Sequence, residues 1–157
     1  MAYCTQAQLA ESVTARKLIE LCDDEKLARS TSTLSAAIAL NSAIDTRLDA
    51  AIAKADGICD SYLRNRYDTP LTEIPDALNV CAIDLAIYYL YRRRRLEFNT
   101  PESVREDYDD AMAWLKDLSN KLVELGIDEP AASSKDSHAY ASYGTARFTT
   151  SILDGSG

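Results

Sequence analysis

The segment from Asp76 to Arg95 constrains the fold more than any other part of this chain. Its apolar side chains recur at helical spacing on two adjoining stripes. A helix that is apolar around most of its circumference must lie in the middle of a protein, because little of its surface suits water. The first stripe holds Leu78, Cys81, Ala82, Leu85, Tyr88 and Tyr89, and the second holds Ile83, Ile87, Leu90 and Tyr91. The sequence therefore predicts a central helix with other helices packed around it.

Two more long helices are predicted on either side of this central one. The first spans Ile44 to Arg66 and ends before Pro70, because the residue preceding a proline is pushed out of the helical region. The other spans Pro101 to Leu125, where Gly126 is suited to stop it. We expect the deepest burial at four positions on the three helices, which are Leu63, Leu85, Tyr89 and Leu115.

The N-terminal part is predicted to be helical up to Cys22. Thr5 and Gln8 have the spacing of a capping box, in which each side chain bonds the other's backbone N–H. The apolar pattern slips phase near Thr14, which indicates two short helices or one kinked helix. The charged residues after Cys22 are compatible with more helix, and the pattern assigns no state to residues 30–43.

These elements predict an all-α fold, a small bundle of four to five helices over residues 1–128. Residues 129–157 are predicted to form an extended C-terminal arm, because their apolar residues alternate with period two near Phe148. Such an arm adds a strand to another chain or fills its grooves, and a disordered tail is the alternative. No apolar run is long enough to span a membrane, and the N-terminus does not resemble a signal peptide.

Charge is unevenly distributed along a chain whose net charge is −8. An acidic protein lacks the basic footprint that nucleic-acid binding requires. The basic block Arg92, Arg93, Arg94 and Arg95 directly precedes a helix rich in acids. The block could complement the negative end of its own helix, contact a neighbouring subunit, or contact nucleic acid. In the subunit-contact interpretation its partners are Asp107, Asp109 and Asp110, and reversing Arg93 and Arg94 to glutamate should block assembly while leaving the subunit folded.

No set of residues in the sequence forms a recognisable catalytic or metal site. Four cysteines stand far apart and the single histidine is His138, so we predict no metal, no cofactor and no enzymatic activity. Asp84 is the one charge in the apolar part of the central helix. We expect it to form a structural ion pair with Arg64 or Arg66, and a catalytic carboxylate is the alternative. Nine tyrosines suit surfaces buried by assembly.

The order of several segments resembles the small head–tail connector (adaptor) proteins of Mu-like phages and prophages. The resemblance rests on MAYCTQAQL, DGICDSYLRNRYDTPL, IPDALNVCAIDLAIYYLYRRRR, PESVREDYDDAMAWLKDLSNKLVELG and GTARFTTSILDG. The family typically opens with a short M-x-Y-x-T-x-x-x-L segment, and residues 22–43 match its pattern least.

This resemblance implies a ring of about twelve subunits below the portal of a DNA-filled capsid. The ring would extend the DNA channel, and an acidic wall would let DNA pass without specific binding. Implied partners are the portal protein, through the arm, and the next tail or terminator protein, within a virion assembled in a bacterial cytoplasm. The arm residues expected to bind the portal are Tyr140, Tyr143, Arg147, Phe148, Ile152 and Leu153. The rival functions are a small helical DNA-binding regulator and a small enzyme.

Overall fold

The computed structural model describes residues 2–69 and 71–127. Within these ranges the chain forms six α-helices and no strand, which confirms the all-α class. One helix more than predicted is present, because residues 34–40 form a short helix of their own. The helices are α1 (Gln6–Val13), α2 (Ala15–Cys22), α3 (Leu34–Leu40), α4 (Ala43–Leu63), α5 (Asp76–Arg93) and α6 (Glu102–Ser119). The predicted arm and the boundary at residue 128 lie outside the described residues.

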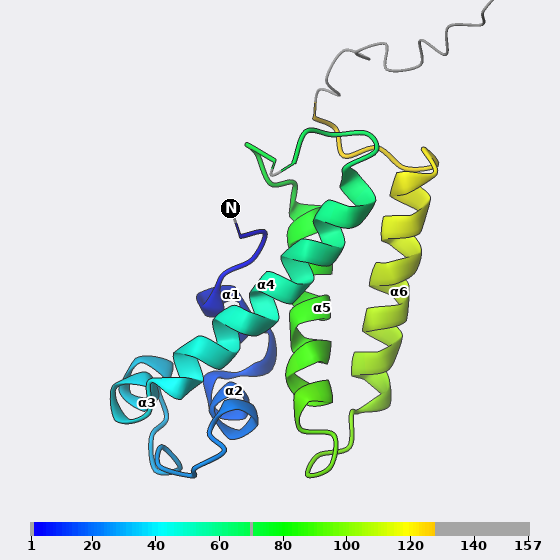
Figure 1. Ribbon diagram of the computed structural model, residues 1–157. Helices are drawn as coiled ribbons and strands as arrows, with labels where there is room; N and C mark the ends of the chain where they lie inside the picture. The colour runs from blue at the N-terminus through cyan, green and yellow to red at the C-terminus, as the bar shows by residue number, and fades with distance from the viewer. Residues whose placement is uncertain (1, 70, 128–157) are drawn as a thin grey trace, which may run out of the picture.

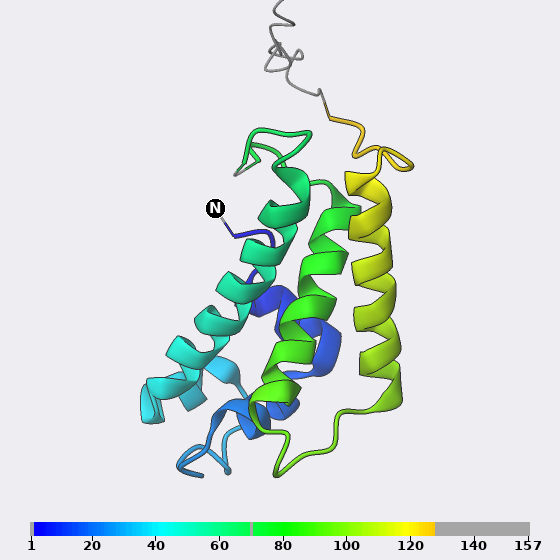
Figure 2. The same ribbon diagram turned by 45° about the vertical axis from the view of Figure 1, so that its right-hand side comes forward.

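Helix α5 is the central element that its apolar circumference predicted. It packs against both α4 and α6, which also contact each other, while α1 and α2 pack against α4 and α5 (Figures 1 and 2). Leu63, Leu85 and Leu115 are fully buried, as expected. Tyr89 is only half-buried, because it lies at the edge of the core beside the rings of Tyr88 and Tyr108.

The N-terminal helices are separate, and the capping box is confirmed. The backbone N–H of Gln8 donates to the Thr5 hydroxyl over 3.3 Å, and the Gln8 side-chain oxygen accepts from the backbone N–H of Thr5 over 2.9 Å. Thr14 has a φ of 76°, a value that no α-helix residue adopts, so the helix breaks there. This break accounts for the slip of the apolar pattern.

The charged segment after α2 is a folded loop, because one buried carboxylate organises it. Asp23 accepts hydrogen bonds from the amides of Leu27 (3.1 Å) and Ala28 (2.7 Å) and from the side chain of Asn41 (3.0 Å). These bonds close the chain on itself, and Ala28 is fully buried beneath the loop. Helical continuation past Cys22 is thereby excluded.

The end of α6 differs from its prediction. The helix ends at Ser119 in a motif where Leu122 donates to the Asp117 carbonyl (2.9 Å) and Lys121 donates to the Leu118 carbonyl (3.2 Å). Lys121 occupies the left-handed position with a φ of 64°, so Gly126 does not terminate this helix. Arg66 donates to the carbonyls of Leu118 (2.8 Å) and Val123 (2.7 Å), which fixes the helix end to the bundle.

The long helices give the domain two distinct ends. The loop between α2 and α3 and the loop between α5 and α6 lie at one end, at the bottom of Figures 1 and 2. Residues 64–69, 71–75 and 120–127 lie at the other end. Among the helices described, none is both long and apolar enough to cross a membrane.

Candidate assembly surface

The fold divides the four-arginine block by contacts: Arg93 and Arg94 bond to their own chain and are called the inward pair, although Arg93 is still exposed, whereas Arg92 and Arg95 are called the outward pair. Arg93 lies against the C-terminal end of α2, where its guanidinium donates to the two carboxylate oxygens of Asp24 over 2.7 and 2.9 Å and also to the Leu21 carbonyl. Arg93 holds the pKa of Asp24 below its usual value, with further contributions from Arg47 and Arg94. Arg93 therefore joins the end of α5 to the C-terminal end of α2.

Arg94 is the more deeply placed of the inward pair, with only 7% of its surface exposed. It donates to the Glu20 carbonyl over 2.6 Å and pairs with Glu97, and its guanidinium lies 4.8 Å from the centre of the Phe98 ring. The unsatisfied carbonyls at the C-terminal end of α2 favour a cation at this place. Arg93 and Arg94 are therefore both engaged inside their own chain, and the predicted subunit contacts through them stay a prediction.

Arg92 and Arg95 are the outward pair. With Arg105 of α6 they line a shallow hollow of about 670 Å³ between the end of α5 and the start of α6, which we name the basic hollow. Its complete lining is Tyr88, Arg92, Arg95, Phe98, Asn99, Thr100 and Arg105. No carboxylate lines it, and within residues 2–69 and 71–127 neither Arg92 nor Arg95 forms an ion pair. This is a concentrated positive surface on an acidic protein.

The predicted acidic partners are exposed on α6. Asp107, Asp109 and Asp110 all point to solvent, and none of them forms an ion pair with another described residue. We name this set the acidic face. The basic hollow and the acidic face thus lie on one domain, with Arg105 of the hollow on the same helix as the three acids, and both are accessible to another molecule.

Three tyrosines gather beside the basic hollow. The rings of Tyr88 and Tyr108 stack with centroids 3.9 Å apart, and Tyr89 meets them edge-on at 5.6 and 6.4 Å. All three are half-buried, and burial raises the pKa of Tyr108. Sequence reasoning noted the excess of tyrosine but missed this cluster, since it depends on the register between α5 and α6. Rigid aromatic rings beside arginines are the composition of energetically important interface patches.

The predicted ion pair of Asp84 with Arg64 or Arg66 is not what the structure shows. Asp84 lies two turns along α5 and faces Asp107 of α6, whereas Arg66 lies at the opposite end of α6. Burial, reinforced by the charge of Asp107, raises the pKa of Asp84 to about 6. Helices α4 and α5 are antiparallel, so the C-terminal end of α4, which Arg64 and Arg66 follow in the sequence, lies at the end of the bundle where α5 begins (Figure 1).

The histidine, cysteine and acidic side chains in the described part of the chain do not come together as a metal centre. No group of three or more histidine, cysteine or acidic side chains there is placed to hold a metal ion. Cys4, Cys22, Cys59 and Cys81 are all free and buried, which suits small apolar core residues. Burial also raises the pKa of the Cys22 thiol to about 11, so it is not an activated nucleophile.

The fold and its exposed charges define a helical domain that carries both a basic hollow and an acidic face. Residues 3–142 match the model of the family described as Bacteriophage Mu, Gp36, and the chain belongs to that family of phage proteins.

Two curated relatives are similar to parts of the chain. The Mu-like prophage FluMu protein gp36 of Haemophilus influenzae is 27% identical over 85 residues, which cover 54% of this chain and 57% of that protein. Gene product J of Escherichia phage Mu is 27% identical over 92 residues, covering 59% of this chain and 62% of that protein. The chain thus spans about three fifths of the length of these relatives.

Proposed function

We propose that this protein is a head–tail connector (adaptor) subunit, which forms a ring below the portal of a tailed phage, extends the DNA channel and docks the tail. The observation that carries the proposal is the presence of both a basic hollow without carboxylates and an exposed acidic face on one small domain. A head-to-tail contact between two different surfaces closes into a ring when its rotation divides a full turn. The resemblance to the head–tail connector proteins of Mu-like phages supports a location at the head–tail interface.

In this ring the basic hollow of one subunit receives the acidic face of the next. Arg92 and Arg95 are exposed and without carboxylate partners among the described residues, and Asp109 and Asp110 are exposed on α6. Pairing them across subunits would leave no like charges in contact. The tyrosine cluster beside the hollow would supply the buried area that exposed ion pairs alone do not provide.

The remaining charge suits a channel wall. The chain has 25 acidic and 17 basic residues, and repulsion between acids and phosphates lets DNA slide without binding. The role is structural and not enzymatic. The C-terminal arm, which lies outside the described residues, is proposed to dock on the portal, while the next tail or terminator protein binds the free side of the ring.

Mass determination of the pure protein, alone and mixed with portal rings from the same phage, tests this function. We expect the mixture to contain portal rings carrying about twelve added copies of the subunit. A variant lacking residues 139–157 should fold but fail to join the portal. If the full-length protein never associates with portal rings, the connector role is wrong.

The basic hollow is also the feature that would favour the alternative, a DNA-binding regulator. Such a protein needs a positive surface that follows a groove or a strand, whereas this hollow is flanked by acids. Gel-shift titration with duplex DNA separates the two functions. The connector proposal predicts no salt-sensitive, saturable shift.

A further inference from the structure

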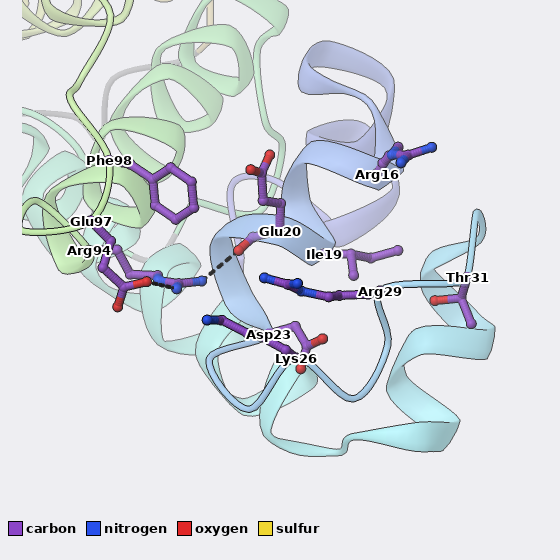
Figure 3. A pocket seen from close by; sticks show the side chains of 10 residues that line it. All are labelled: Arg16, Ile19, Glu20, Asp23, Lys26, Arg29, Thr31, Arg94, Glu97 and Phe98. Carbon is purple, nitrogen blue, oxygen red and sulfur yellow. Dashed lines mark hydrogen bonds and ion pairs between the residues drawn. The ribbon is translucent and has the colours of Figure 1, made fainter.

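A second cavity lies at the loop end of the domain, apart from the basic hollow's exposed arginines. It has a volume of about 590 Å³ and is enclosed by α2, by the loop after α2 and by the end of α5 (Figure 3). We name it the loop cavity. Its size is in the range of cavities that hold small ligands.

The acids that line the loop cavity are already engaged within the chain. Asp23 accepts the three hydrogen bonds that organise the loop. Glu20 pairs with Lys17 at 2.9 Å, and Glu97 pairs with Arg94. Each carboxylate therefore has a partner that offsets its charge or satisfies its oxygens.

Two cations of the loop cavity have no carboxylate partner among the described residues. Lys26 and Arg29 form no ion pair with any residue of the described ranges, and both side chains point toward Arg94 in Figure 3. Arg16 also lines the cavity, but its charged end points away from Arg94. Two cations thus converge on a third that is held in place by the fold.

Arg94 has a buried side-chain nitrogen that lacks a hydrogen-bond partner. Its side chain is 6% exposed, and its Nε lies 3.4 Å from an Asp24 oxygen without forming a hydrogen bond to it. Nε is the one buried side-chain nitrogen or oxygen in the described part of the chain that has no hydrogen-bond partner. A buried donor without an acceptor is costly, so such groups commonly mark a place for a bound ligand or ion.

We propose that the loop cavity binds a compact oxyanion, the phosphate or carboxylate group of a ligand. The oxyanion would lie among Lys26, Arg29 and Arg94 and accept charge-assisted hydrogen bonds from them. The loop is pre-organised for this, because the Asp23 hydrogen bonds fix its backbone and hold Lys26 at a φ of 61°.

Isothermal titration calorimetry with inorganic phosphate, at constant ionic strength, tests the site on the full-length protein. We expect saturable binding of one phosphate per chain. Lys26→Gln and Arg29→Gln should each weaken binding about tenfold, the usual effect of losing one charge-assisted hydrogen bond. Both residues are exposed at the cavity mouth, so the variants should fold, and thermal unfolding checks this. Arg95→Gln is the matched control, because it removes the same charge from the basic hollow and should leave binding unchanged.

A parallel titration with acetate identifies the oxyanion. Acetate binding as tight as phosphate binding would assign the site to a carboxylate, and much weaker acetate binding would assign it to a phosphate. Absence of saturable binding of either anion would overturn the proposal. A loss in Arg95→Gln as large as that in Arg29→Gln would overturn it too, because the anion would then occupy the basic hollow.

Discussion

The inward and outward arginines of one four-residue block have opposite roles. Arg93 and Arg94 bind carbonyls and carboxylates of their own chain, and they hold the end of α5 against α2. Arg92 and Arg95 face solvent in the basic hollow. Successive residues at a helix end point in different directions, so adjacent identical residues can belong to the core and to the surface. A run of like residues in a sequence is therefore not a unit of function.

The largest effect should come from reversing the inward pair. Arg93→Glu/Arg94→Glu would place two new acids beside Asp24 and Glu97, with Arg94's position almost fully buried. We expect a loss of about 4 kcal/mol or more in unfolding free energy, since unpaired buried charges are strongly destabilising. Urea denaturation followed by circular dichroism measures it. A folded double variant of normal stability would show that the inward contacts are dispensable, as the sequence interpretation assumed.

When each inward arginine is replaced by alanine separately, the more deeply buried one should cost more unfolding free energy. Arg94→Ala should cost about 2–4 kcal/mol, because Glu97 loses its partner and a buried cation that binds the Glu20 carbonyl is removed. Arg93→Ala should cost about 1 kcal/mol, since its side chain is 28% exposed and its ion pair is screened by water. The same denaturation experiment compares them. Equal losses of unfolding free energy in the two variants would contradict the claim that the more deeply buried arginine contributes more to stability.

Two carboxylates, Asp24 and Asp84, make the stability of the protein depend on pH in opposite directions. The pKa of Asp24 is lowered by Arg93, so its stabilising effect is present at neutral pH and disappears as pH falls through that lowered value. The pKa of Asp84 is raised to about 6 by burial and Asp107, so the native state binds its proton more tightly and loses stability as pH rises from about 4 to 6.

Asp84→Asn should therefore stabilise the protein at pH 7, by about 1–2 kcal/mol after allowing for partial exposure. The gain should vanish below about pH 4, where the native carboxyl is protonated. Unfolding free energies at several pH values measure this. A gain that stays constant across this pH range would mean that the charge of Asp84 is not its cause.

The smallest effect on stability should come from reversing the outward pair. Arg92 and Arg95 are exposed and form no ion pair within the described ranges, so Arg92→Glu/Arg95→Glu should change the unfolding free energy by less than about 0.5 kcal/mol. Ring assembly should nevertheless be lost. A large loss of stability would place these residues in the fold rather than at an interface.

Local sequence patterns predicted the helices, but they could not predict which residues from distant segments of the chain contact each other. The stripes on α4 and α5 and the Thr5 capping box were sufficient to predict the helical bundle, since these signals lie within a few residues. The end of α6 was missed because Lys121 adopts a conformation that usually favours glycine. The inward arginines and the neighbour of Asp84 were missed because Asp24 and Asp107 are distant in sequence.

A charge-swap experiment tests the central claim, that the outward arginines bind the acidic face of a neighbouring subunit. Native mass spectrometry with portal rings would be applied to Arg92→Glu/Arg95→Glu, to Asp109→Arg/Asp110→Arg, and to the protein carrying all four changes. We expect each double variant to fail to form rings, while the four changes together restore them, because every contact then pairs opposite charges again. Normal rings from either double variant, or no recovery when all four changes are combined, would contradict this pairing.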